Sequence, residues 1–184
     1  QRRVDELVAD LADQRRGAAG AFAAAVSVEL ESIGMGEGEF VAELGEREPS
    51  SSGADEVTFL IRPNPGLPLA PVAQTASGGE LSRIALAIAA VGGGATMIFD
   101  EIDAGIGGQT AHAVADTLVR LSERAQVVTI THLPQIASRA DRHFSVEKVP
   151  GDPTHTRIRE LGDDERREEI ERMLGGREFL STVA

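Results

Sequence analysis

Cysteine, tryptophan and tyrosine are absent from this 184-residue chain, and six phenylalanines are its only aromatic residues. Without cysteine the chain can form no disulfide, thiolate nucleophile or cysteine-based zinc site, and this composition suits a reducing cytoplasm. With so few aromatic residues, the core must be built from Ala, Val, Leu and Ile, as in parallel sheets that are covered by helices. A chain of this length can bury one good core and a small appendage, so we expect one domain of the α/β class.

Lysine and long apolar runs are scarce as well. Lys148 is the only lysine among the 18 basic residues, and the formal net charge is -12. A surface this acidic repels phosphate backbones, which excludes DNA binding by bulk electrostatics. No apolar run approaches the roughly 20 residues that span a bilayer, and the first residues lack a signal-peptide core, so we expect a soluble protein without membrane contact.

The amino-terminal part of the chain follows a helical period, with apolar residues from Val4 to Leu30 and charges between them. A helix of about 30 residues is roughly 45 Å long. Two interpretations stay open here: a surface helix packed on the domain, or the last stretch of a coiled coil that enters a globular head. We assign residues 1–33 to this helix and residues 34–184 to the lobe that follows.

Beyond the helix, two strands are predicted at residues 39–44 and 56–62, and the proline-rich residues 63–71 predict an extended loop. Helices and strands then alternate, which is typical of a mainly parallel sheet flanked by helices. The predicted elements are a helix at 79–91, a strand at 96–99, a helix at 109–121, a strand at 126–131, a short helix from Pro134, strands at 142–149 and 154–161, and a charged helix at 163–174.

Two carboxylates, Asp100 and Glu101, follow the strand at 96–99. Ligands of open α/β sheets bind beyond the carboxyl ends of the strands, and successive residues there point to opposite faces. One carboxylate therefore suits Mg²⁺, which prefers hard oxygen ligands, and the other suits positioning or deprotonating a water. On its own the pair could equally be a solvated strand end.

His132 follows the next strand, and Pro134 is ready to begin a helix after it. A lone histidine at a strand end is more often a structural cap or a surface residue. If the two strands are neighbours, however, His132 lies near Asp100 and Glu101 at one rim of the sheet. The combination of a histidine and two carboxylates at one rim favours a functional site.

Residues 77–80 (Ser77, Gly78, Gly79 and Glu80) precede a helix that is apolar almost all round. Ser77 followed by Glu80 is a capping box. That box does not account for the two glycines, which cost on the order of 1 kcal/mol each in a first turn relative to alanine. Bare amides at a helix start bind anionic phosphate, so we favour a phosphate contact.

A glycine-rich turn at residues 103–108 leaves the first of the two strands, beginning with Asp103. Its glycines let the backbone approach a partner or ligand closely, although such a turn taken alone is usually only a turn.

Taken together, these segments resemble the motif set of the ABC ATPases. Residues 77–80 match the signature, Asp100 and Glu101 the end of the Walker B strand, Asp103 the start of the D-loop, and His132 the switch histidine. Four motifs in this order are far more specific than any one alone. The amino-acid sequences of residues 74–83, 99–108 and 131–137 resemble in particular the RecN family of SMC-like bacterial DNA-repair proteins.

The resemblance implies the carboxy-terminal lobe of an ATPase head whose amino-terminal half, with the Walker A loop, is separated from it by a coiled coil. Asp100 would then help to hold Mg²⁺, Glu101 would activate the hydrolytic water, and His132 would sense the γ-phosphate of ATP. A second, identical head would bind the same ATP through the signature residues Ser77, Gly78, Gly79 and Glu80.

Other implications concern the whole protein. Asp103 would communicate across the interface between the two heads. The resemblance also implies DNA double-strand-break repair and recombination, DNA contact through the full-length protein rather than this acidic surface, and a cytoplasmic, nucleoid-associated location.

The chain departs from the ABC pattern in one respect. A Walker A loop reads Gly-x-x-x-x-Gly-Lys-Ser/Thr, and Lys148 has no such glycines before it. We therefore expect the chain alone neither to hold ATP tightly nor to hydrolyse it at a useful rate.

Three alternatives stay open at this point. One is the head of a transporter ATPase or of another SMC relative, although a transporter subunit would carry Walker A directly upstream. Another is a dimerisation module of the same fold without catalysis. The third is DNA binding through Arg139, Arg142 and His143, where Asp141 makes a solvated surface the simpler interpretation.

Overall fold

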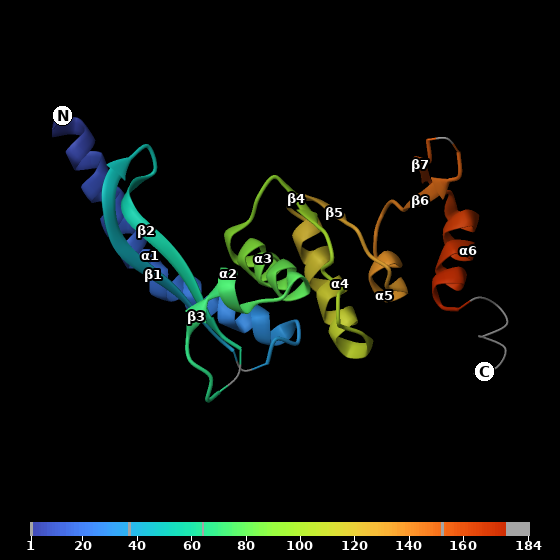
Figure 1. The fold of residues 1–184 in the computed structure, drawn as a ribbon, viewed down its shortest axis with the longest axis horizontal. Helices are drawn as coiled ribbons and strands as arrows, with labels where there is room; N and C mark the ends of the chain where they lie inside the picture. Colours follow the sequence, from blue (N-terminus) through green and yellow to red (C-terminus); the bar gives the residue numbers. More distant parts are fainter. Residues whose placement is uncertain (1, 37, 64, 152, 176–184) are drawn as a thin grey trace.

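The computed structural model describes residues 2–36, 38–63, 65–151 and 153–175, and the chain runs through them from one end of an elongated molecule to the other (Figure 1). The long helix α1 (Arg2–Ser32) and the hairpin of β1 (Glu39–Ser50) and β2 (Gly53–Arg62) form one end. Helices α3 (Gly78–Gly92) and α4 (Gly108–Ser122) lie in the middle, beneath β4 (Thr96–Phe99) and β5 (Gln126–Thr129). The other end holds α5 (Pro134–Ala137), β6 (Phe144–Val149), β7 (His155–Glu160) and α6 (Asp163–Met173).

Helix α1 confirms the helix predicted from the apolar period, and its carboxyl-terminal half joins the core of the lobe. Val26, Leu30 and Ile33 are fully buried and share one cluster with Ile84 of α3 and Val114 of α4. Toward the amino end, Val4 and Leu7 are exposed. The division between residues 1–33 and 34–184 stays a prediction.

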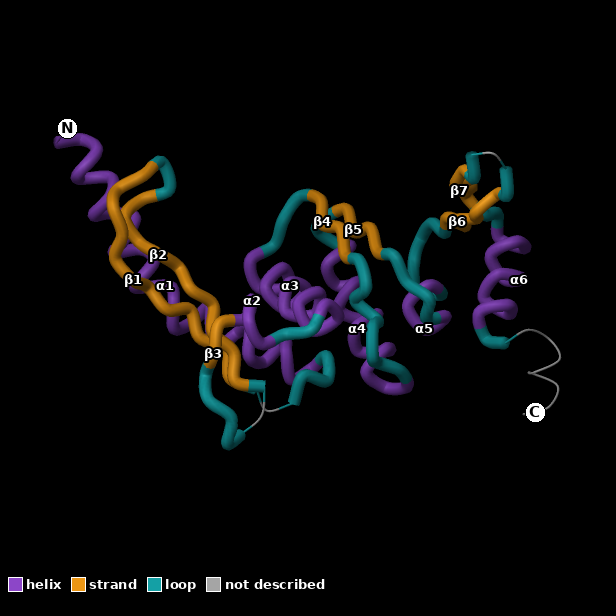
Figure 2. Tube along the Cα trace, viewed as in Figure 1, coloured by secondary structure: helices purple, strands orange, loops and turns teal. Residues whose placement is uncertain are grey.

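The hairpin lies along α1 (Figure 2) and is longer than predicted, because β1 continues through Pro49 to Ser50. Asp55 of β2 is buried, and its carboxylate accepts a hydrogen bond from Arg15 of α1 at 3.0 Å. Arg16 lies 4.0 Å from the same carboxylate. A buried ion pair therefore ties the hairpin to the helix.

Asp55→Ala is expected to lower the free energy of unfolding by about 2–3 kcal/mol. Removing one partner of a fully buried pair costs about 3–5 kcal/mol, and Arg15 can partly reach water, which reduces the loss. Denaturant unfolding measures the effect. Asp13→Ala is the matched control, because Asp13 forms an exposed pair with Arg16 that contributes at most about 1 kcal/mol. Equal losses in the two variants would contradict the role of Asp55.

The α/β class is confirmed, and the described residues contain less parallel pairing than predicted. Strands β4 and β5 pair in parallel, with Thr96 opposite Gln126 and Phe99 opposite Thr129. Strands β1, β2 and β3 (Ala70–Pro71) form an antiparallel sheet, as do β6 and β7. Strands that follow each other through a short turn can only pair antiparallel, whereas β4 and β5 are joined through α4. Strand β3 lies within the loop predicted at residues 63–71, and a one-turn helix, α2 (Val72–Thr75), for which nothing was predicted, follows it.

One face of the parallel pair β4 and β5 is uncovered. Phe99 is buried toward the helices, while Ile98 is 70% exposed and its neighbour Val128 is 44% exposed. Ile130, directly after β5, is 58% exposed. Parallel strands in α/β proteins are normally buried on both faces, so this face lacks a layer. Among the described residues, no helix is both long and apolar enough to cross a membrane.

Candidate nucleotide site

The carboxyl ends of β4 and β5 bring the predicted residues to one rim. The backbone N–H of Ile130 donates to the carbonyl of Phe99 at 2.9 Å, so the two strands end level with each other. Asp100 and Glu101 follow β4 and His132 follows β5, and all three residues are exposed. As predicted, these three residues therefore follow neighbouring strands at one rim of the sheet.

Glu101 has an unusual backbone. Its φ of 54° is the one positive value at a non-glycine residue in the described part of the chain. Its backbone N–H donates to Oδ1 of Asp100 at 2.9 Å, which ties the Asp100 carboxylate to the backbone of the turn. Left-handed backbone at a glutamate is unfavourable, and such strain is concentrated at functional sites. Because of this turn, the Glu101 side chain leaves the backbone in a different direction from the one it would have if β4 continued.

Asp103 is turned into its own lobe, with 2% of its surface exposed. Its Oδ2 accepts hydrogen bonds from the Thr131 hydroxyl, from the His132 N–H at 2.8 Å and from the Leu133 N–H at 3.3 Å. Nδ1 of the His132 ring lies 3.1 Å from the same oxygen. One carboxylate thus holds residues 131–133, which we call the His132 loop. The resemblance assigned Asp103 to an interface, and the sequence gave no sign of this contact.

Hydrogen bonding sets the protonation state of Asp103. Burial raises its pKa, but the bonds from Thr131 and His132 and the nearby imidazole outweigh burial, so the pKa lies below its ordinary value. A carboxyl with a lowered folded pKa stabilises the protein above its unfolded pKa of about 3.9, and loses this contribution as pH falls through the folded pKa.

Asp103→Asn is therefore expected to reduce the free energy of unfolding by about 2 kcal/mol near neutral pH, because hydrogen bonds to a charged acceptor are replaced by weaker ones. Below about pH 4 the difference from the wild type should shrink. Denaturant titrations from pH 7 down to about pH 2.5, through the lowered pKa, measure it. A difference that stays constant over this range would contradict the assignment, and Asp116→Asn, at the exposed pair with Arg139, serves as the control.

The signature turn, residues 77–80, confirms the predicted capping box. Both the backbone N–H and the hydroxyl of Ser77 donate to Oε2 of Glu80, at 2.7 and 2.8 Å. These bonds lower the pKa of Glu80 and keep it ionised. Ser77 and Gly78 are exposed, so the start of α3 is open to a ligand.

The signature turn also lies closer to the carboxylates of its own lobe than predicted. The Ser82 hydroxyl donates to the carbonyl of Asp100 at 2.6 Å, and a Cβ added to Gly78 would lie 3.2 Å from Oε2 of Glu101. The turn therefore does not simply face away, because Ser82 anchors the start of α3 to the end of β4.

Gly79 is needed for close packing. A Cβ at this position would lie 2.8 Å from both the Cβ and the carbonyl oxygen of Ala104 in the D-loop, residues 103–108. On the same helix, Arg83 is buried and its Nη1 donates to that carbonyl at 2.9 Å. Sequence reasoning missed Arg83. The available signal was a charged residue on a helix whose other inward positions are apolar.

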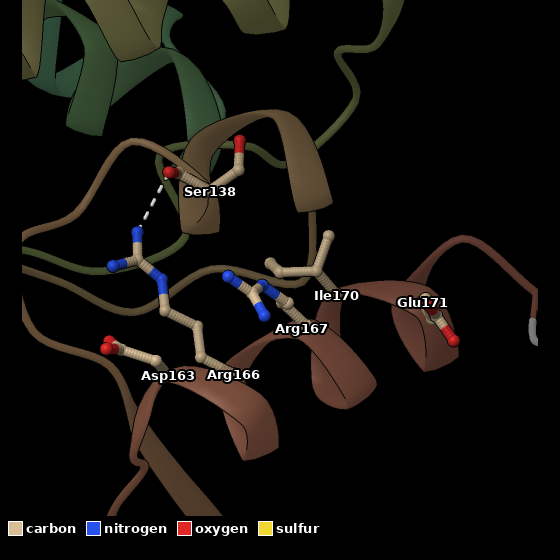
Figure 3. Close-up of a pocket in the computed structure, with 6 residues that line it drawn as sticks. All are labelled: Ser138, Asp163, Arg166, Arg167, Ile170 and Glu171. Carbon is tan, nitrogen blue, oxygen red and sulfur yellow. Dashed lines mark hydrogen bonds between the residues drawn. The ribbon is translucent and has the colours of Figure 1, made fainter.

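A hollow between α5 and α6 lies away from this rim (Figure 3). Its lining residues are Ser138, Asp163, Arg166, Arg167, Ile170 and Glu171. Arg166 donates to the backbone carbonyls of Ser138, at 2.9 Å, and Ala140, and so ties α6 to the end of α5 (Figure 3). Its two arginines and two acidic residues balance in charge, so this hollow has no excess charge for a nucleotide.

The basic residues near β6 are already paired. Arg139 forms an ion pair with Asp116 at 2.9 Å, and Arg142 one with Glu160 at 2.6 Å. Burial lowers the pKa of His143 and favours its neutral form. These pairs leave little free positive charge for DNA at this place.

No cluster of three or more acidic or histidine side chains suited to a metal ion is found in the described ranges. Asp100 fits Mg²⁺ in another way. It is an exposed carboxylate at a strand end, and Mg²⁺ is usually held by one or two carboxylates together with water and the phosphates of its substrate.

Comparison with known proteins gives a consistent picture. A "DNA repair protein RecN" of Streptomyces coelicolor is 44% identical over 96% of the chain, and one of Deinococcus radiodurans is 50% identical over 70% of it. The chain spans 34% and 23% of the lengths of these two relatives. No family model matches the sequence.

Solved structures show the same fold. An Smc head domain with a coiled coil and joint from Pyrococcus yayanosii superposes with a TM-score of 0.61 at 23% identity, covering 83% of this chain and 29% of that one. A chain described for the ATP-driven dimerization and DNA-stimulated activation of SMC ATPases gives a TM-score of 0.55 at 21% identity, covering 89% of this chain and 96% of that one. The fold is therefore that of the carboxy-terminal lobe of an SMC-type head.

Proposed function

Since this chain belongs to the RecN family over almost its whole length, we propose that it is the carboxy-terminal half of an ATP-hydrolysing head in a DNA-repair protein. The observation that carries the proposal is the common rim of β4 and β5, where Asp100, Glu101 and the Asp103-bound His132 come together. A dimerisation module without catalysis has no need of a strained glutamate and a held histidine at the same rim.

Each residue at the rim has a role that its position supports. Asp100 helps to hold Mg²⁺, and the Mg²⁺–ATP complex supplies the phosphoryl group that is transferred. Glu101, exposed after β4 on a left-handed backbone, orients the attacking water and accepts its proton. His132, oriented by Asp103, donates toward the charge that develops on the γ-phosphoryl group.

The partners follow from what this lobe does not contain. The exposed face formed by Ile98, Val128 and Ile130 fits the amino-terminal half that carries the Walker A loop. The open start of α3 fits the γ-phosphate of ATP held by a second copy of the head, with Ser77, Gly78 and Gly79 as contacts and Glu80 as the cap that holds the turn. ATP then joins two identical heads.

DNA contact belongs to the whole protein, because the charge of this lobe is -12. Double-strand-break repair and recombination in the cytoplasm, at the nucleoid, are the setting that we propose. In this setting α1 is the end of a coiled coil that enters the head, and its exposed Val4 and Leu7 face the other helix of that coil.

ATP hydrolysis and head association by the complete protein test the proposal, and Glu101→Gln is the decisive variant. The proposal is wrong if the complete protein hydrolyses ATP and this variant hydrolyses it equally fast.

A further inference from the structure

Arg83 is a buried charge without a carboxylate partner among the described residues. Only 8% of its surface is exposed, and no described carboxylate lies within 4.0 Å of its guanidinium. Burial lowers its pKa, and Glu80, one helical turn earlier, acts in the opposite direction. Burying a charge costs several kcal/mol unless it is well compensated, so the contacts that it does make are informative.

Those contacts join α3 to the D-loop. Nη1 of Arg83 donates to the carbonyl of Ala104 at 2.9 Å, and Nε approaches Sδ of Met35, beyond the end of α1, at 3.5 Å. One turn earlier on α3, Gly79 lies so close to Ala104 that a Cβ at position 79 would be 2.8 Å from the Cβ and the carbonyl oxygen of Ala104. Helix α3 thus binds the Ala104 carbonyl through Arg83. Contact with Gly79 sets how closely Ala104 can approach the helix.

The residue before Ala104 holds the His132 loop. Asp103 accepts hydrogen bonds from Thr131, His132 and Leu133, so the positions of the D-loop and of the His132 loop are linked. Adjacent residues of one short turn are therefore fixed to α3 on one side and to the His132 loop on the other. The D-loop thereby connects α3 with the His132 loop.

We propose that Arg83 is a positioning residue for ATP hydrolysis, which sets the D-loop through the Ala104 carbonyl and, through Asp103, the place of His132. The inference rests on the proposed function. It links the helix that follows the signature turn to the histidine of the same lobe, by way of Ala104 and Asp103. In this proposal Arg83 acts only through the Ala104 carbonyl.

Arg83→Met in the complete protein keeps the length and apolar stem of the side chain and removes its donors. We expect kcat to fall about ten- to hundredfold, since displacing a reacting group by about 1 Å can cost that much, while KM for ATP changes less than about twofold. Arg83→Lys, which keeps a charged donor, should recover part of kcat. Arg124→Met is the matched control, because Arg124 also donates to backbone carbonyls of α3, at its far end.

A double-mutant cycle with His132→Ala separates positioning from general damage. If Arg83 acts through His132, adding Arg83→Met to His132→Ala lowers kcat little further, because the interaction has already been lost. Independent, multiplying losses would overturn the proposal, as would a folded Arg83→Met variant with wild-type kcat. If Arg83→Met does not fold, Arg83→Lys and Arg83→Gln carry the same cycle, with the same outcomes.

Glu101→Gln keeps the two proposals apart. If it leaves turnover unchanged, the proposed function fails. If it abolishes turnover while Arg83→Met behaves like Arg124→Met, only the role of Arg83 fails.

Discussion

Glu101→Gln in the complete protein is expected to lower the rate of ATP hydrolysis about 10²–10⁴-fold, the usual contribution of a positioned general base. Glutamine keeps the size of the side chain and can still form hydrogen bonds, but it cannot accept the proton of the attacking water. Because Asp100 and the signature turn remain unchanged, ATP should still join the heads. Steady-state phosphate release measures the first effect, and size-exclusion chromatography with and without ATP measures the second.

Glu123→Gln is the control for this experiment. Glu123 is exposed at the end of α4, far from the rim of β4 and β5, and the variant removes the same charge. Turnover should stay at the wild-type rate. Loss of both hydrolysis and association in Glu101→Gln would show that Glu101 supports the fold of the site rather than the chemistry.

The second large effect concerns the chain by itself. The purified 184-residue chain is expected to hydrolyse ATP at less than about 1% of the rate of the complete protein, because it contains no Walker A loop, whose glycines and lysine hold the β- and γ-phosphates. Adding the amino-terminal half as a separate polypeptide should restore turnover. Measurable hydrolysis by the pure chain alone would refute the expectation.

Variants on the exposed face of β4 and β5 test whether the amino-terminal half binds there. Ile98→Glu together with Val128→Glu places two charges on the face where the missing layer is expected, and should abolish the restored turnover, since a buried unpaired charge costs several kcal/mol. Val57→Glu on β2 is the matched control, because Val57 is comparably exposed but belongs to the hairpin beside α1. Restoration by both variants alike would place the partner half elsewhere.

The sequence by itself determined the local elements and the order of the motifs. The apolar period predicted α1, and α3, β4 and α4 lie within one residue of their predicted bounds. The sequence also placed Asp100, Glu101 and His132 at strand ends, because residues close together in the chain decide where a strand ends and a turn begins. The absence of a Walker A loop and the acidic charge were visible there too.

The tertiary structure alone decided which side chains meet across the sequence. The contact of Arg83 with Ala104 depends on how α3 lies against the D-loop, and that of Asp103 with His132 depends on β4 and β5 being neighbours. The share of parallel pairing and the bare face at Ile98 also emerged only in three dimensions. Sequence periodicity reports which face of an element is apolar, but the partner of a buried charge is set by the packing of distant elements, which no local pattern encodes.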